Sequence, residues 1–189
     1  MSNTPYAATI EHVRMAIKST FELVDEWFDR SPELRCYKPI GGGWSIDEIL
    51  EHITLTSHFL MLVVRNSARK AVKRAASGAS IPFAESDLDV LEPIGRRGSF
   101  SWSRPEHMMP TGVGSSEQVR GNMQEQTREC LEILERLGRG EGALHKVRMS
   151  VNESGRLDIY QWLYFLAQHA RRHLGQMQEV EAEWKEQTA

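Results

Sequence analysis

Three histidines are spaced so that their imidazole nitrogens could meet inside a helical protein. His169 and His173 are four residues apart, which places them on one face of a helix about one turn apart. His52 lies on an earlier segment, between apolar residues at helical spacing. Three imidazoles leave one coordination position of a divalent ion open, as in catalytic rather than purely structural metal sites. The residues predict one metal site formed by His52, His169 and His173.

The surroundings of the histidine pair strengthen this prediction. An apolar stripe with residues every three or four positions runs along residues 158–187, through Trp162, Leu166, Met177, Val180 and Trp184. An unpaired imidazole in such a stripe would cost about 1–3 kcal/mol in lost hydration. A shared metal ion removes that cost for all three histidines. The alternative is a hydrogen-bonded core histidine that binds no metal, which is common for single histidines on apolar faces.

Two polar residues adjoin the predicted ligands. Glu51 precedes His52, and neighbours on a helix point about 100° apart, so we expect Glu51 to face solvent. Gln176 follows His173 by three residues and could hydrogen-bond that imidazole, although a surface amide is equally consistent. Protons compete for ligand nitrogens, so metal affinity should weaken as the pH falls towards the imidazole pKa of about 6.5.

Other polar residues fit structural roles better. His58 lies about 240° around the helix from His52 and should not share its ion. His12 and His58 are interpreted as structural or solvated residues. The basic run from Arg65 to Arg74 is interpreted as a solvated helix end, since cations favour a helix C-terminus; steering of an anionic cofactor is the alternative. No residue is identified as a general acid or base.

Four helices are predicted to position these residues. Helical periodicity covers residues 6–30, 45–75, 115–137 and 158–187. Ser45 with Glu48 predicts a capping box, as does Ser115 with Gln118, and Asp158 is the expected cap of the last helix. Residues 76–114 contain four prolines and five glycines, which predicts a long loop with at most one or two short helices, pinned by Phe100 and Trp102. Residues 143–151 could include an extended segment.

Composition limits the classes of function. The chain has 189 residues, 40% hydrophobic and 26% charged, which predicts a single globular domain over residues 1–189. A net charge of −3 provides no positive field for nucleic acid. Cys36 and Cys130 form no CxxC pair, so no disulfide framework or thiolate zinc site is expected. The N-terminus lacks a signal-peptide pattern and the most apolar stretch is too short for a membrane span, which predicts a cytoplasmic protein.

Two motifs and their order resemble a known family. The motifs are the stretch from Gly43 to Ile53 (GWSIDEILEHI) and the stretch from Gln168 to Gln176 (QHARRHLGQ). With residues 110–116, they make the sequence similar to the DinB-like (DinB/YfiT) superfamily of metalloenzymes. The resemblance implies an all-α, up-down-down-up four-helix bundle with a long crossover loop between helices 2 and 3. It also implies a divalent metal, usually zinc or nickel, on His52, His169 and His173, and often a homodimer.

The resemblance also suggests a class of reaction. Several members of the superfamily are transferases or isomerases that use a low-molecular-weight thiol. We therefore expect thiol-dependent S-transferase or isomerase-like chemistry on a small-molecule substrate. The alternatives are a metal-dependent hydrolase and a non-catalytic, stress-associated metal-binding bundle. Whether the protein is an enzyme at all is left open by the sequence.

Overall fold

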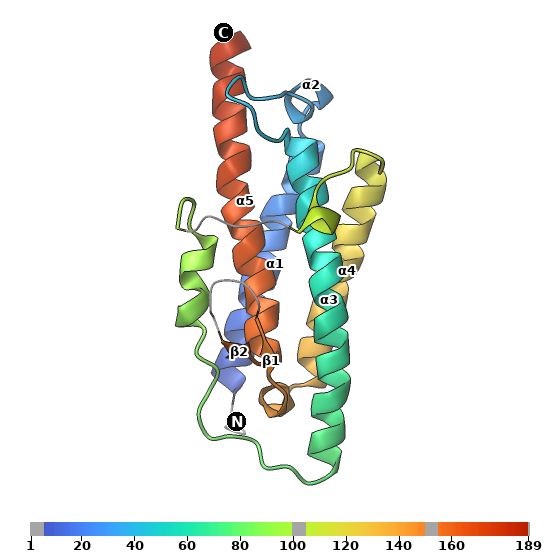
Figure 1. The fold of residues 1–189 in the computed structure, drawn as a ribbon, viewed down its shortest axis with the longest axis vertical. Helices are drawn as coiled ribbons and strands as arrows, with labels where there is room; N and C mark the ends of the chain where they lie inside the picture. Colours follow the sequence, from blue (N-terminus) through green and yellow to red (C-terminus); the bar gives the residue numbers. More distant parts are fainter. Residues whose placement is uncertain (1–5, 100–104, 150–154, 189) are drawn as a thin grey trace.

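Four long helices dominate the computed structural model, which describes residues 6–99, 105–149 and 155–188 (Figure 1). They are α1 (Ala7–Asp25), α3 (Ile46–Ala76), α4 (Ser116–Arg136) and α5 (Ile159–Thr188). Helices α1 and α3 each pack against both α4 and α5, and the buried apolar side chains form one cluster between them. The predicted all-helical class is confirmed, and the predicted ranges of the four helices agree closely with the observed ones.

Short elements connect the long helices. The 3₁₀ turn η1 (Glu26–Asp29) tightens the end of the first predicted helix, and α2 (Pro32–Arg35) follows it. The predicted long loop contains η2 (Asp89–Gly95) and η3 (Glu106–Met108), while η4 (Glu141–Leu144) follows α4. Strand β1 (Val147–Arg148) pairs antiparallel with β2 (Arg156–Leu157), so the predicted extended segment is confirmed only over two residues. Phe100 and Trp102 lie outside the described residues.

The predicted caps start the helices that carry the histidines. Ser45 Oγ accepts a hydrogen bond from Glu48 N (3.3 Å), and the Glu48 carboxylate accepts one from Ser45 N (2.8 Å). Asp158 and Gln161 form the equivalent reciprocal pair at the start of α5, at 3.0 and 3.1 Å. The Ser115 capping box starts α4. Each pair satisfies backbone N–H groups that a helix start leaves without partners.

Helix α5 lies at the centre of the molecule. Residues 159–170 are all buried, because α1, α3, η2 and η4 pack around this half of the helix. The apolar stripe predicted from the sequence therefore widens to the whole circumference of the helix. As a result, His169 lies near the end of a fully enclosed segment, away from bulk water.

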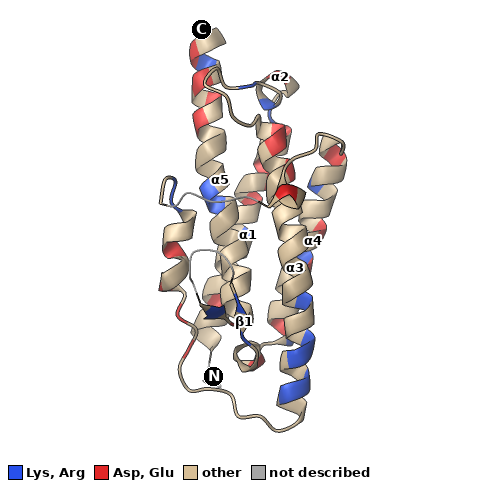
Figure 2. Ribbon diagram, in the orientation of Figure 1, with Lys and Arg blue, Asp and Glu red and all other residues tan. Residues whose placement is uncertain are grey.

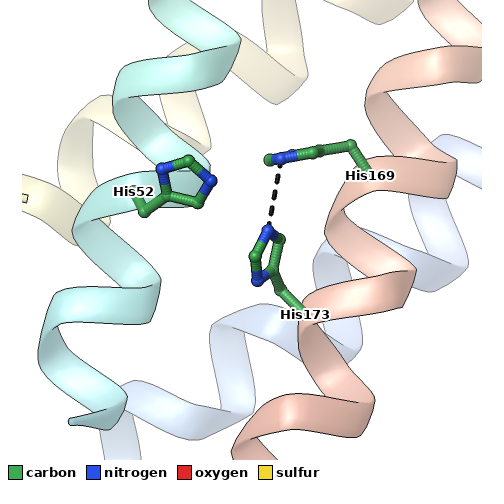
Figure 3. A group of neighbouring side chains, drawn as sticks. All are labelled: His52, His169 and His173. Carbon is green, nitrogen blue, oxygen red and sulfur yellow. Dashed lines mark hydrogen bonds between the residues drawn. The ribbon is translucent and has the colours of Figure 1, made fainter. Parts of the chain in front are cut away.

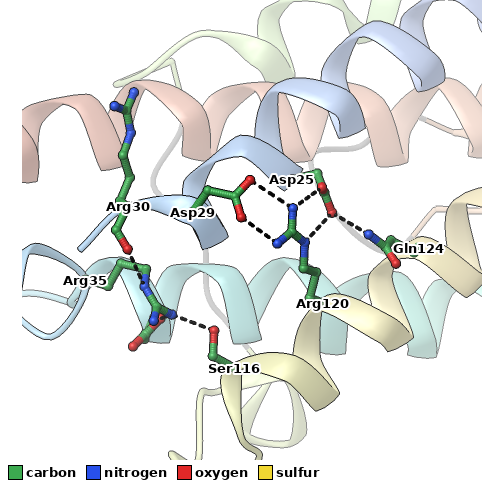
Figure 4. Close-up of polar contacts among 8 residues, drawn as sticks. Asp25, Asp29, Arg30, Arg35, Ser116, Arg120 and Gln124 are labelled. Atoms are coloured by element: carbon green, nitrogen blue, oxygen red, sulfur yellow. Dashed lines mark hydrogen bonds and ion pairs between the residues drawn. The ribbon is translucent and has the colours of Figure 1, made fainter. Parts of the chain in front are cut away.

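A polar network made of two groups of contacts links α1, α2, α3 and α4 at one end of the bundle (Figure 4). The Arg120 guanidinium, on α4, donates to the carboxylates of Asp25 and Asp29 at 2.6–3.1 Å. Arg35 donates to Asp47 at the start of α3 (2.7 Å) and to a serine at the start of α4. Arg120 lowers the pKa of Asp25 through these hydrogen bonds. The network fixes where α3 begins relative to α1 and α4.

The basic run lies at the C-terminal end of α3, where the ribbon is coloured blue for Lys and Arg in Figure 2. Its first member, Arg65, forms a bidentate ion pair with Glu129 (2.6 Å each), and Arg74 donates to the Leu144 carbonyl. Arg69, Lys70 and Lys73 are exposed. The placement agrees with the interpretation of a solvated helix end. Among the described residues, no helix combines the length and apolar character that crossing a membrane requires.

Candidate metal centre

The three predicted histidines meet between α3 and α5 (Figure 3). His52 lies two turns into α3, and His169 and His173 lie on successive turns of α5. All three are buried, with exposed fractions of 4%, 8% and 8% respectively. One ring nitrogen from each lies within 4.8 Å of the other two. The structure thus brings His52 together with two histidines that lie more than 100 positions later in the sequence.

Two of the nitrogens already have the spacing of metal ligands. His169 Nε2 and His173 Nε2 are 3.2 Å apart. Metal–nitrogen bonds of about 2.0–2.1 Å in tetrahedral geometry place two ligand nitrogens about 3.3–3.4 Å apart. Without a cation, these nitrogens can attract each other only when one of them carries a proton. A cation between them would accept both lone pairs.

Hydrogen bonds behind the rings fix which nitrogen faces the centre. His52 Nδ1 donates to the Met108 carbonyl oxygen (2.7 Å), and His173 Nδ1 donates to Gln176 Oε1 (2.9 Å). Both rings therefore carry their proton on Nδ1, which leaves the Nε2 lone pair as the ligand. The amide of Gln176 makes the contact that the sequence left as one of two alternatives.

Burial keeps the imidazoles neutral. It lowers the pKa of His169 well below the ordinary value of 6.5, and the neighbouring His173 and His52 add to the effect. Burial likewise lowers the pKa of His173 to about 3. A neutral imidazole is the form that binds metal. The lowered pKa values of His169 and His173 shift proton competition at these two nitrogens to more acidic pH than the ordinary imidazole value of 6.5.

Aromatic rings surround the histidines. The Trp44 ring lies 4.7 Å from the His52 ring, and Phe165 stacks on His169 with an interplanar angle of 13° and a centroid separation of 6.3 Å. Phe165 is buried, as is Trp162 one turn before it on α5. These contacts limit rotation of the imidazoles and keep the local dielectric constant low.

The donor set fits a divalent transition-metal ion. Within the described ranges, no carboxylate or cysteine joins the three histidines. Three imidazoles suit zinc, nickel, copper and iron, and geometry and supply decide between them. Neutral, oriented and buried nitrogens are the ligands that such an ion requires, so the residues present fit the implied group.

The prediction for Glu51 is wrong. Its side chain is buried, with an exposed fraction of 8%. It accepts hydrogen bonds from Thr111 Oγ1 (2.6 Å) and from the Gly112 backbone N–H (2.8 Å). The angle between neighbouring residues would leave Glu51 in solvent only if α3 were covered on one face. The segment before α4 covers a second face, which the periodicity of α3 alone did not reveal.

The remaining sequence candidates lie away from the centre. His58 is exposed and packs against Phe59, and the exposed His12 meets Tyr164 edge to face. None of these side chains belongs to the group that could hold a metal.

Two further buried polar atoms on the helices that carry the histidines were not identified from the sequence. Within the described part of the chain, Thr56 Oγ1 and Trp162 Nε1 have no hydrogen-bond partner. Thr56 lies one turn after His52 on α3, and Trp162 lies two turns before His169 on α5. The helical periodicity of the sequence places both residues on the faces that carry the histidines. It does not show that their polar atoms have no hydrogen-bond partner.

Comparison with known proteins agrees with the motifs. Neither the curated proteins nor the solved structures gave a match. The sequence profile of the DinB superfamily matches residues 11–177, a range that includes all three histidines and most of the four long helices. The chain therefore belongs to the DinB superfamily.

Proposed function

We propose that this protein is a metal-dependent enzyme in which His52, His169 and His173 hold one divalent cation, zinc or nickel. The observation that carries the proposal is the convergence of three buried imidazole nitrogens from two helices within 4.8 Å. Three ligands leave a coordination position open for a reactant. Membership of the DinB superfamily supports the same assignment.

A divalent cation with an open position lowers the pKa of a thiol or a water molecule and polarises a carbonyl group. The chain itself supplies orientation and exclusion of water. The Met108 carbonyl and Gln176 hold two rings with Nε2 inward, while Trp44 and Phe165 pack against the histidines. Thr56 Oγ1 adds a buried hydroxyl that a small-molecule substrate could hydrogen-bond.

Among the reactions such a site supports, we favour transfer or isomerisation that uses a low-molecular-weight thiol as co-substrate. The support is the resemblance to thiol-using members of the superfamily. Hydrolysis at the same centre and metal binding without catalysis are the competing functions. All three candidate functions use the same metal site and differ in the molecules that react there, if any. Activity assays with different substrates therefore separate them.

The metal site is tested by the metal content of protein purified without a histidine tag. The wild type should retain about one equivalent of zinc or nickel, and His169→Ala less than about a tenth of an equivalent, because two imidazoles bind far more weakly than three. Glu129→Gln, which removes a carboxylate distant from the centre, is the matched control and should retain wild-type content. Equal and negligible metal in all three proteins would refute the site.

The reaction class is tested with small thiols and a chromogenic electrophile. Turnover that requires thiol and metal, and that is lost in His52→Ala, is the expected result. Hydrolysis of ester or amide substrates without thiol would favour the hydrolase. Stoichiometric metal without turnover in either assay would favour the non-catalytic protein.

The order of the four long helices and the oligomeric state are two further points of the proposal. We propose the up-down-down-up order of the family for α1, α3, α4 and α5, supported by the packing of α1 and α3 against both α4 and α5. We further propose a homodimer with no nucleic-acid or membrane partner. Sedimentation analysis of the purified chain tests the dimer, because a monomeric mass at micromolar concentration would contradict it.

A further inference from the structure

The segment before α4 lies along α3 beside the metal centre. Its η3 turn packs against α3, and the His107 ring contacts Phe59 edge to face with centroids 4.4 Å apart. Further along, the Met108 carbonyl accepts from His52. Thr111 and Gly112 then reach Glu51, the residue before the ligand. Residues 107–112 therefore contact α3 at three successive places.

The turn that reaches Glu51 has a defined local structure. Thr111 Oγ1 donates to Glu51 and accepts from Val113 N (3.3 Å). Gly112 adopts a left-handed conformation with φ of 67°, which a glycine adopts without strain. In this conformation the Gly112 N–H points at the second carboxylate oxygen of Glu51. Both oxygens of a buried carboxylate are thus used to hold one turn.

This turn determines the position of an atom that contacts a ligand. Only two residues lie between Thr111 and Met108, whose carbonyl oxygen is 2.7 Å from His52 Nδ1. A displacement of the turn would move that carbonyl, and His52 would then lose the acceptor that keeps its proton on Nδ1. Nε2 would then carry the proton in part of the molecules and could not bind metal.

We infer that Glu51 is a positioning residue of the metal centre. It holds the Thr111–Gly112 turn so that the Met108 carbonyl keeps His52 in the metal-binding tautomer. The inference rests on the proposed function for its consequence, metal affinity. The positioning itself is a property of the metal-free protein.

The predicted dependence of metal affinity on Glu51 is tested by measuring zinc binding to the 189-residue chain. Partners that orient a metal-bound histidine typically contribute about 10–100-fold in affinity. Because Glu51 acts through an intervening segment, Glu51→Ala should weaken zinc binding on the order of tenfold, and Glu51→Gln less, since its amide oxygen keeps one of the two contacts. Competition with a chromophoric chelator measures these changes.

Glu141 offers a matched control. Its carboxylate is equally buried, with an exposed fraction of 7%, and accepts from a backbone N–H, that of Arg139, at 2.9 Å. It lies in η4, outside the group of histidines. Glu141→Gln should leave zinc affinity unchanged. Equal effects of the Glu51→Gln and Glu141→Gln substitutions would overturn the inference.

Nuclear magnetic resonance of metal-free protein with ¹⁵N-labelled histidine tests the positioning directly. The wild type should show His52 protonated on Nδ1, and Glu51→Ala should show a mixture of tautomers. An unchanged tautomer would overturn the inference even if zinc affinity falls. If Glu51→Ala does not fold, Thr111→Val, which removes one hydroxyl from an exposed residue, serves in the same two measurements. A wild type that binds no zinc would refute the proposed function, and the tautomer measurement would still decide the role of Glu51.

Discussion

At the scale of single residues, the candidate metal centre consists of imidazoles that burial keeps neutral. His169 and His173 lie 3.2 Å apart at Nε2, and both have a lowered pKa because α5 is enclosed where they lie. Two positive rings at this distance would repel each other strongly in a region of low dielectric constant. The folded protein therefore holds the pair ready for a cation and resists its protonation.

The lowered pKa values of His169 and His173 should make the metal-free protein less stable in acid. Below pH 6.5 the unfolded chain binds protons at His169 and His173 that the folded chain does not, because both pKa values are lowered in the folded state. The free energy of unfolding of the metal-free protein should therefore fall as the pH falls below 6.5, by on the order of 1 kcal/mol per pH unit for each histidine. For His173 this loss continues down to about pH 3. Urea titrations at several pH values measure the slope.

The matched variant is His173→Leu, which cannot be protonated. Its free energy of unfolding should depend less steeply on pH between 6.5 and 4 than that of the wild type. Identical slopes in the two proteins would show that the pair is protonated as readily in the folded state as in the unfolded chain.

Thr56 provides a second prediction at this scale. Its buried hydroxyl has no hydrogen-bond partner among the described residues, so it loses hydration on folding without compensation. Thr56→Val should leave the free energy of unfolding unchanged or raise it by up to about 1 kcal/mol. Ser67 is buried as well, and Ser67→Ala is the comparison at a position away from the histidines. A loss of more than about 1 kcal/mol in Thr56→Val would mean that the hydroxyl is satisfied in the folded protein.

At the scale of the elements, sequence reasoning succeeded where the signals are local. Ser45, Ser115 and Asp158 start their helices as expected, because a cap and its partner lie three residues apart. The apolar stripes placed His52, His169 and His173 on inward faces. These features depend on neighbours within one or two turns.

Features that depend on distant segments were not predicted. Glu51 is buried because Thr111 and Gly112, which lie 60 residues later in the chain, cover its side of α3. Short elements such as α2 and η1 are too brief to show periodicity. The angle of about 100° between helix neighbours assigned Glu51 to the solvent face, and only tertiary packing shows that a second face of α3 is covered.

The capping box at the start of α3 can be tested separately from the metal. Ser45→Ala removes the acceptor for Glu48 N and should lower the free energy of unfolding by about 1 kcal/mol. Zinc affinity should change by less than about threefold, because His52 is two turns further on and is held by Met108. Chemical denaturation and the chelator competition give the two values. A large loss of zinc affinity with an unchanged free energy of unfolding would show that the Ser45 cap serves the metal site rather than the stability of the helix.

At the scale of the whole molecule, the three histidines come from helices that are far apart in the sequence, Ile46–Ala76 and Ile159–Thr188. His52 belongs to α3 and the HxxxH pair to α5, and these helices pack against each other. Apolar side chains of both helices belong to the same core cluster, so the interface does not rest on the histidines alone. A cation at this place would add a further link between α3 and α5.

Metal binding should therefore stabilise the entire fold. At zinc concentrations 100 times the dissociation constant, the free energy of unfolding should rise by about 2.7 kcal/mol, provided that the unfolded chain binds zinc weakly. For a chain of this length, that corresponds to a rise in the melting temperature on the order of 5–10 °C. Calorimetry with added zinc measures it, and His169→Ala should show little change. An equal rise in both proteins would place the stabilising zinc elsewhere.

The most direct test of the central claim is a crystal structure of the zinc-loaded protein, with anomalous diffraction recorded on both sides of the zinc absorption edge. We predict one anomalous peak about 2.0–2.1 Å from Nε2 of His52, His169 and His173, with a solvent or added ligand in the remaining position. A peak bound by other residues, or none at this place in zinc-saturated crystals, would contradict the account.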